Sequence, residues 1–215
     1  MKINKLKLIL SSLANLLPMF FGIAVSEKLP DTMPIHWNIN GEVDGYASKA
    51  VVIFVAPILL LILHLGCIFA TKADNKNKEQ NEKVTSIIYF IIPVVSIVVN
   101  GIIYSTVLGY NINVATVAFL LLGVLFLCLG NYMPKTKQNR TIGIKIFWTL
   151  RSEENWNRTH RFAGWLWFLL GFLLIILAFI PSDVTYVISG VALFLAAAAP
   201  FVYSYIMYKK EKSDK

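Results

Sequence analysis

Two acidic residues and a histidine lie close together in a polar stretch of the chain, and such groups can perform general acid–base catalysis. Glu153, Glu154 and His160 could exchange protons with a substrate if their side chains met in one pocket. The sequence holds no HExxH motif and no glycine-rich phosphate loop, and no nucleophile is evident beside a positioned base. We therefore expect these residues to form salt bridges within the structure, and the protein not to be an enzyme.

Two further groups have side chains that could bind a metal or carry protons. His36, Glu42 and Asp44 are of metal-binding types, but three such residues without a recognised spacing do not define a site. We expect neither a metal nor another cofactor. His64 lies inside an apolar block and could relay protons across a membrane. No acidic residue occupies the central part of any apolar block, so we expect a neutral imidazole bonded to a neighbouring helix.

The elements that hold these residues are six long apolar blocks. Apolar residues make up 57% of the 215 residues and charged residues only 15%, whereas a soluble domain has about 25% charged residues. Each block is long enough to cross a hydrocarbon core as a helix. The sequence therefore predicts an all-α, polytopic membrane protein with spans near residues 6–25, 50–70, 85–109, 114–131, 162–180 and 184–208.

Prolines inside these blocks predict kinked helices, because neighbouring helices can satisfy the carbonyl groups that a proline frees. They are Pro18, Pro57, Pro93 and Pro200. The first block also resembles a signal peptide, since basic residues precede it. It is longer than the apolar core of such a peptide, so we expect it to remain as the first span.

The basic residues between the blocks predict the orientation in the membrane. Of the 20 Lys and Arg residues, all except Lys28 and Lys49 lie near the N-terminus, in the second and fourth connections, or in the tail. Cytoplasmic segments carry an excess of Lys and Arg, so we expect both termini and residues 132–161 inside the cell and residues 26–49 outside. The net charge of +8 then indicates contact with anionic lipid, and we expect no direct binding of nucleic acid.

The outer connection, residues 26–49, has the composition of an ordered cap. Its prolines restrict the backbone, and Gly41 and Gly45 stand in dipeptides that favour turns. Trp37 has the amphipathic ring that is typical of a membrane interface. We therefore expect a compact extracellular loop in place of a flexible linker.

The inner connection, residues 132–161, also contains signals of order. Ser152 is a good helix N-cap, and Glu154 and Arg158 are spaced to form an ion pair along one helix face. The helix that starts here is expected to continue into the fifth span. Residues 142–150 are too apolar for a free loop, so they should lie at the membrane interface or pack under the helices.

Residues of these two connections resemble a known family. The inner one resembles the SdpI family signature at Gly130, Asn131, Met133, Asn139, Ile142, Gly143, Ile144, Lys145, Trp148, Thr149, Leu150, Trp156, His160, Arg161 and Phe162. The outer one resembles an N-terminal domain of unknown function that often precedes it, at Leu29, Pro30, Ile35, His36, Trp37, Asn38, Gly41, Asp44, Gly45, Ser48 and Lys49. Together the two resemblances cover nearly the whole chain.

The resemblance implies a multi-pass protein of the bacterial plasma membrane. The family's named function is immunity against a secreted antibacterial peptide, the SDP cannibalism toxin. The family also implies signalling, in which the protein holds a small cytoplasmic repressor of transcription at the membrane. Residues expected to face the toxin are His36, Trp37, Asn38, Gly41, Asp44, Gly45 and Lys49. Residues expected to dock the repressor are Asn131, Asn139, Gly143, Lys145, Trp148, Thr149, Trp156, His160 and Arg161.

The chain is expected to have three parts. They are an N-terminal helical hairpin, residues 1–70, with the cap 26–49; a linker and third helix, residues 71–113; and an SdpI-like domain, residues 114–215, with the loop 132–161. Two other functions stay open. A small transporter or channel would need a hydrated cavity that reaches the membrane centre. A membrane enzyme would need its two glutamates and His160 to converge on one pocket.

Overall fold

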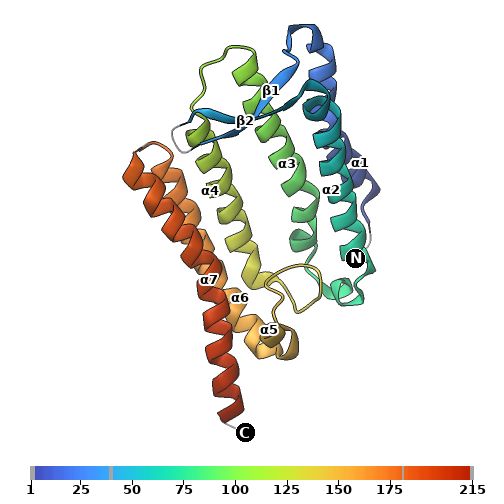
Figure 1. Cartoon of the computed structure of the whole chain (residues 1–215). Coiled ribbons are helices and arrows are strands. Elements are labelled where there is room, and N and C mark those ends of the chain that lie inside the picture. The colour runs from blue at the N-terminus through green and yellow to red at the C-terminus, as the bar shows by residue number, and fades with distance from the viewer. Residues whose placement is uncertain (1–2, 39–40, 181, 214–215) are drawn as a thin grey trace. The chain divides into compact units, whose positions relative to one another are not determined.

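The computed structural model describes residues 3–38, 41–180 and 182–213. Its long helices are α1 (Lys5–Ala24), α2 (Ala56–Ala73), α3 (Glu82–Val107), α4 (Val114–Tyr132), α6 (Glu153–Leu177) and α7 (Asp183–Ser213) (Figure 1). A short helix, α5 (Phe147–Arg151), precedes α6. Between α1 and α2 in the sequence stand two antiparallel strands, β1 (Thr32–Trp37) and β2 (Val43–Ser48).

All six long helices are long and apolar enough to cross a membrane, which confirms the predicted fold class. Their exposed sides carry large apolar residues. On α1, for example, Leu13 and Leu17 are half exposed, whereas Asn15 between them is completely buried. This arrangement suits helices surrounded by lipid, because apolar side chains can face the hydrocarbon while polar ones face other helices.

The start of α6 confirms two local predictions. The Ser152 hydroxyl accepts a hydrogen bond from the backbone N–H of Asn155 at 3.1 Å, as an N-cap does. One turn of helix separates Glu154 from Arg158, and their side chains form an ion pair at 2.7 Å. As predicted, the helix then continues without a break into the fifth span, so the inner connection and the membrane segment share one rigid element.

The chain divides into two compact units. One comprises residues 2–69 and 86–121, and the other comprises residues 70–85 and 122–215. Residues 70–85, which the sequence places in a linker region, therefore belong to the same unit as α6 and α7.

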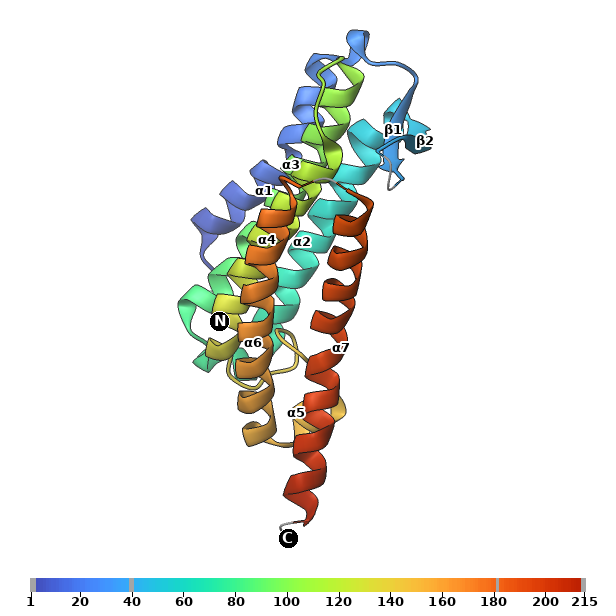
Figure 2. The ribbon, with the colours of Figure 1, turned by 90° about the vertical axis from the view of Figure 1, so that its left-hand side faces the viewer.

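In the first unit, the two strands form a hairpin that packs onto the ends of helices (Figures 1 and 2). Met33 of β1 is completely buried in a cluster with Leu29, Val52, Ile53, Ile103 and Tyr104. The sequence predicts an ordered cap here but not its strands. Proline usually argues against a strand, yet Pro34 is tolerated in β1 because both strands of a two-stranded sheet are edges.

In the second unit, α4 and α6 touch through glycine residues. A side chain added at Gly130 would lie 2.5 Å from the backbone nitrogen of Phe168 and 2.8 Å from the carbonyl oxygen of Gly164. The same close approach recurs one heptad away, where Gly123 faces Gly171. Small residues let membrane helices approach until their backbones are in contact. On the other side of α6, α7 lies alongside it (Figure 2).

Replacing Gly130 by alanine should destabilise the protein, because the new methyl group meets backbone atoms of α6 that cannot move aside. Overpacking of this kind costs about 1–3 kcal/mol. Gly190→Ala on α7 is the matched control, since nothing lies within 4 Å of its added carbon, and both changes raise helix propensity. We expect a lower Tm of the purified protein for Gly130→Ala than for Gly190→Ala. Equal Tm values would show that the two helices are not in backbone contact.

Candidate functional site

The inner connection is ordered but irregular. Residues 136–146, which we call the signature loop, run between a short 3-10 turn (Met133–Lys135) and α5. Buried backbone N–H and C=O groups need hydrogen-bond partners. Here many of those partners are side chains, not the backbone of a helix or sheet. The shape of the signature loop therefore depends on particular residue types at particular positions.

Asn139 is the first of these side chains, and it is completely buried. Its Oδ1 accepts hydrogen bonds from the backbone N–H groups of Thr141 and Ile142, at 2.8 and 2.6 Å. Its Nδ2 donates to the carbonyl oxygens of Lys137 and Ile142, at 2.8 and 2.9 Å. One amide side chain thus holds a tight turn, because it supplies both the donors and the acceptor that the turn lacks.

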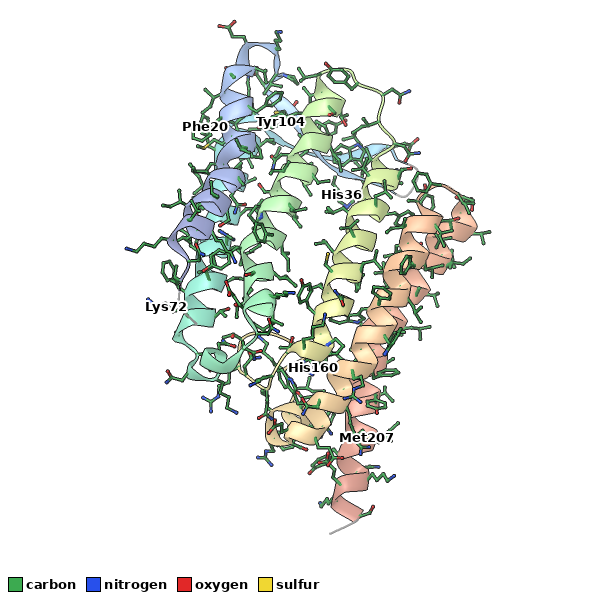
Figure 3. All side chains as sticks on the ribbon, turned by 180° about the vertical axis from the view of Figure 1, so that it is seen from behind. Phe20, His36, Lys72, Tyr104, His160 and Met207 are labelled. Carbon is green, nitrogen blue, oxygen red and sulfur yellow. The ribbon has the colours of Figure 1, made fainter. Side chains whose placement is uncertain are left out.

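His160 of α6 ties the next part of the signature loop to the helix (Figure 3). Its Nε2 accepts a hydrogen bond from the backbone N–H of Ile144 at 3.0 Å. An N–H group can only donate, so Nε2 carries no proton and the neutral ring bears its proton on Nδ1. Nδ1 lies 2.8 Å from the carbonyl oxygen of Trp156 and donates to it. Both ring nitrogens are therefore engaged by the backbone.

Trp156 lies one turn before His160 and has no exposed surface. Its ring stacks on the imidazole with a centroid separation of 3.9 Å, and its Nε1–H donates to the carbonyl oxygen of Thr136 at 2.7 Å. Gly143 sits against this pair with a φ angle of 109°. A side chain there would lie 2.4 Å from His160 Nε2. Glycine is therefore required both by the backbone angle and by the space.

Thr149 closes the far end of the signature loop. Its hydroxyl accepts a hydrogen bond from the backbone N–H of Ile146 at 3.1 Å and lies 2.7 Å from the carbonyl oxygen of Ile144. Beside it, the ring of Trp148 packs on that of Tyr205 of α7, with centroids 5.1 Å apart. The short helix α5 is thereby fixed to both the loop and α7.

A further set of partners comes from residues 74–80, between α2 and α3, which the sequence reasoning did not identify. The carboxylate of Asp74 accepts a hydrogen bond from the backbone N–H of Arg140 at 2.7 Å. The side chain of Gln80 donates to the carbonyl oxygen of Lys137 and accepts from its N–H, at 2.5 and 3.0 Å. Asp74 also caps the 3-10 turn that follows it. Aspartate is a common capping residue, and this was the one signal in the sequence that could have identified the segment.

The sequence-predicted residues of this region fall into two groups. Asn139, Thr149, Trp156 and His160 are buried, and with Gly143 they shape the signature loop from inside. The exposed ones are Asn131, Lys145 and Arg161, of which Lys145 donates to the Thr141 carbonyl oxygen at 3.0 Å. The side chains of Asn139, Thr149, Trp156 and His160 have almost no accessible surface for another molecule, whereas the exposed residues and the partly exposed Trp148 do.

The three side chains that could have formed a catalytic centre do not converge. Glu154 is paired with Arg158, and together with Glu153 it lines a surface groove between α6 and α7. His160 is buried and engaged by the signature loop. The arrangement that an enzyme would need from these three residues is therefore absent.

In the first unit, the hairpin brings the predicted cap residues together. The Nδ1 atom of His36 on β1 is hydrogen-bonded to Oδ1 of Asp44 on β2, and the side chains are 70% and 45% exposed. Gly45 lies across from His36, and a side chain there would come within 2.8 Å of the His36 Cβ. The hydrogen bond and the close packing against Gly45 therefore fix the positions of the exposed His36 and Asp44 side chains on the hairpin surface.

Other predicted cap residues stabilise the hairpin. Asn38 and Glu42 exchange three hydrogen bonds of 2.9 to 3.0 Å at the end of the strands, and Gly41 beside them has a φ angle of 79°. Glu42 is thus engaged away from His36 and Asp44. At the base, Lys49 Nζ donates to the Leu29 carbonyl oxygen at 2.8 Å. Trp37 is half-buried and packs against the hairpin's core cluster.

The requirement for glycine at position 143 can be tested directly. Gly143→Ala should lower the Tm and increase proteolysis of the signature loop, because the methyl group displaces His160 from Ile144. Gly109→Ala is the matched control. Gly109 also has a positive φ of 83° but has nothing within 4 Å of an added carbon, so both variants carry backbone strain of about 1–2 kcal/mol. Equal losses in the two variants would mean that the His160 contact contributes nothing.

Comparison with known proteins gives three findings. The family described as "SdpI/YfhL protein family" matches residues 135–204, and the "Domain of unknown function (DUF1648)" matches residues 13–61. The chain is 29% identical to "Immunity protein SdpI" of Bacillus subtilis (strain 168), over 95% of this chain and 97% of that protein. No solved structure matches the chain. The two family matches cover the hairpin and the signature loop, so this multi-pass protein of the bacterial plasma membrane is similar to the SdpI/YfhL protein family in its C-terminal part and to an immunity protein over nearly its whole length.

Proposed function

We propose that the protein is a membrane immunity protein, which protects its cell from a secreted, membrane-active antibacterial peptide. The observation that carries this proposal is the similarity to an immunity protein over nearly the full length of both chains. A match of that extent includes both the hairpin and the signature loop, so it does not reflect shared apolar composition alone. The protein would act by binding and not by catalysis, in keeping with the separate engagement of Glu154 and His160.

The hairpin is the surface that we assign to the peptide. The excess of basic residues near the termini and in the second and fourth connections predicts that the hairpin faces the outside of the cell. It presents the exposed pair His36 and Asp44, and beside them Tyr46, which is 63% exposed. An aromatic ring next to hydrogen-bonding groups suits an amphipathic peptide, because it offers apolar area and polar anchors together.

The surface around the signature loop is the one that we assign to a cytoplasmic repressor. The buried residues would fix its shape, and Lys145 and Arg161 would supply exposed positive charge. The groove that contains Arg161 also contains Trp165, which is 66% exposed. A tryptophan beside arginine is typical of the membrane interface, so lipid head groups would border the same surface.

The immunity function predicts a change in survival. A sensitive bacterium without its own immunity protein should tolerate a higher dose of at least one peptide from a panel of membrane-active antibacterial peptides when it expresses this chain. Cells that carry the empty vector are the baseline, and equal amounts of membrane-inserted protein must be verified by immunoblot. An unchanged lethal dose for every peptide in the panel contradicts the proposal.

The role of the hairpin can be separated from that of the fold with one pair of variants. Tyr46→Ala should lower the peptide dose that the cells survive, by about tenfold if the ring is an interface anchor. Tyr110→Ala, which removes a ring that is 67% exposed in the connection between α3 and α4, should leave protection unchanged. If both variants protect as well as the unaltered chain, Tyr46 is not part of the peptide-binding surface.

A further inference from the structure

The first unit has an unusually polar interior. The buried residues of α1 are Ser11, Asn15, Pro18 and Gly22, which recur on one helix face. Ser96, Asn100 and Tyr104 recur every four residues on α3, and His64 is completely buried on α2. We use the name polar seam for the six residues Ser11, Asn15, His64, Ser96, Asn100 and Tyr104, each at most 4% exposed.

Contacts between the helices place these residues together. Ser11 Oγ and His64 Nε2 are 2.8 Å apart, which confirms the expected bond between His64 and a neighbouring helix. The hydroxyl of Ser96 donates to the carbonyl oxygen of Asn15 at 3.4 Å. Nearer the hairpin, the Tyr104 hydroxyl lies over Gly22, where an added side chain would come within 2.3 Å of it. The polar seam thus involves all three helices.

Several polar atoms of the seam have no hydrogen-bond partner in the part of the chain that the structure describes. Among the described residues, no group bonds to Nδ1 of His64, to Oδ1 or Nδ2 of Asn15, to Oδ1 of Asn100 or to the hydroxyl of Tyr104. Leaving a buried polar group unsatisfied costs about 1–3 kcal/mol, and lipid cannot supply the missing bonds. Asn15 stands out, because both of its amide atoms are in this state although the residue has no exposed surface.

We propose that the polar seam binds a chain of water molecules, which connects the hairpin end of the first unit to His64. Water fits the set of unsatisfied atoms because it both donates and accepts. A cation would satisfy the oxygen atoms but not the amide N–H groups of Asn15, and the six seam residues carry no permanent charge. This inference is independent of the proposed immunity function.

We place the entry for water at the hairpin end, where the outermost seam residue reaches the surface. A surface groove there is lined by Pro18, Gly101, Tyr104, Ser105 and Tyr110, among others. Tyr104 therefore belongs both to the groove and to the seam. Water entering along its hydroxyl would next meet Asn100 and Asn15, and then the ring of His64. The imidazole could in this way exchange its proton with water although it is buried among helices.

Hydroxyl-radical footprinting of the full-length protein in lipid nanodiscs tests this proposal, since X-ray radiolysis of bound water labels the side chains that the water touches. The matched comparison is between two buried histidines. His64 is 0% exposed with one ring nitrogen unsatisfied, and His160 is 1% exposed with both nitrogens bonded to the backbone. We expect His64 to be labelled several-fold faster than His160. Equal rates of labelling would overturn the proposal.

A variant of Asn15 supplies a second, independent measurement. Asn15→Leu should slow the labelling of His64 and lower the Tm, because the leucine removes two groups that hold water in the seam. If the seam were dry, the same change would remove an unsatisfied amide and raise the Tm. Asn131→Leu, at an exposed position, is the control. Unchanged labelling of His64 in Asn15→Leu, or a raised Tm, would also contradict a continuous chain of water.

Discussion

The inner surface of this protein depends on one constraint: an irregular backbone segment that is packed against helices must have its N–H and C=O groups paired. The signature loop solves this with side chains. Asn139, Thr149 and His160 each bond to the backbone of the loop, and Asp74 and Gln80 do so from another segment. Because each bond needs a particular atom at a particular distance, most substitutions at these positions would leave a buried backbone group unpaired.

This constraint explains why particular residue types stand in and beside the signature loop. The sequence reasoning assigned Trp156, His160 and Gly143 to the docking of a partner, whereas in the structure they hold the signature loop to α6 from inside. Through these contacts they set the positions of the exposed residues around the loop. The two family matches also cover structurally different parts of the chain. One covers the hairpin, which presents exposed side chains, and the other covers the self-paired loop and the helices that hold it.

Features that depend on local chemistry were predictable from the sequence. The spans followed from apolar length, the start of α6 from Ser152, and the bond of His64 from the cost of an unpaired imidazole in a membrane. Features that depend on pairing between distant segments were not predictable. The strands of the hairpin contain a proline and few alternating apolar residues, and the bonds of Gln80 reach 57 positions along the chain. Neither leaves a periodic pattern that one sequence could reveal.

Hydrogen–deuterium exchange of the full-length protein in nanodiscs measures whether side chains pair the backbone of the signature loop. The informative amides are those of Thr141, Ile142 and Ile144, which donate to Asn139 and His160 and not to a helix or sheet. They should exchange far more slowly than amides of an unstructured segment, despite the irregular backbone. Exchange at the rate of an unstructured peptide throughout residues 136–146 would show that these side chains do not pair the backbone of the loop.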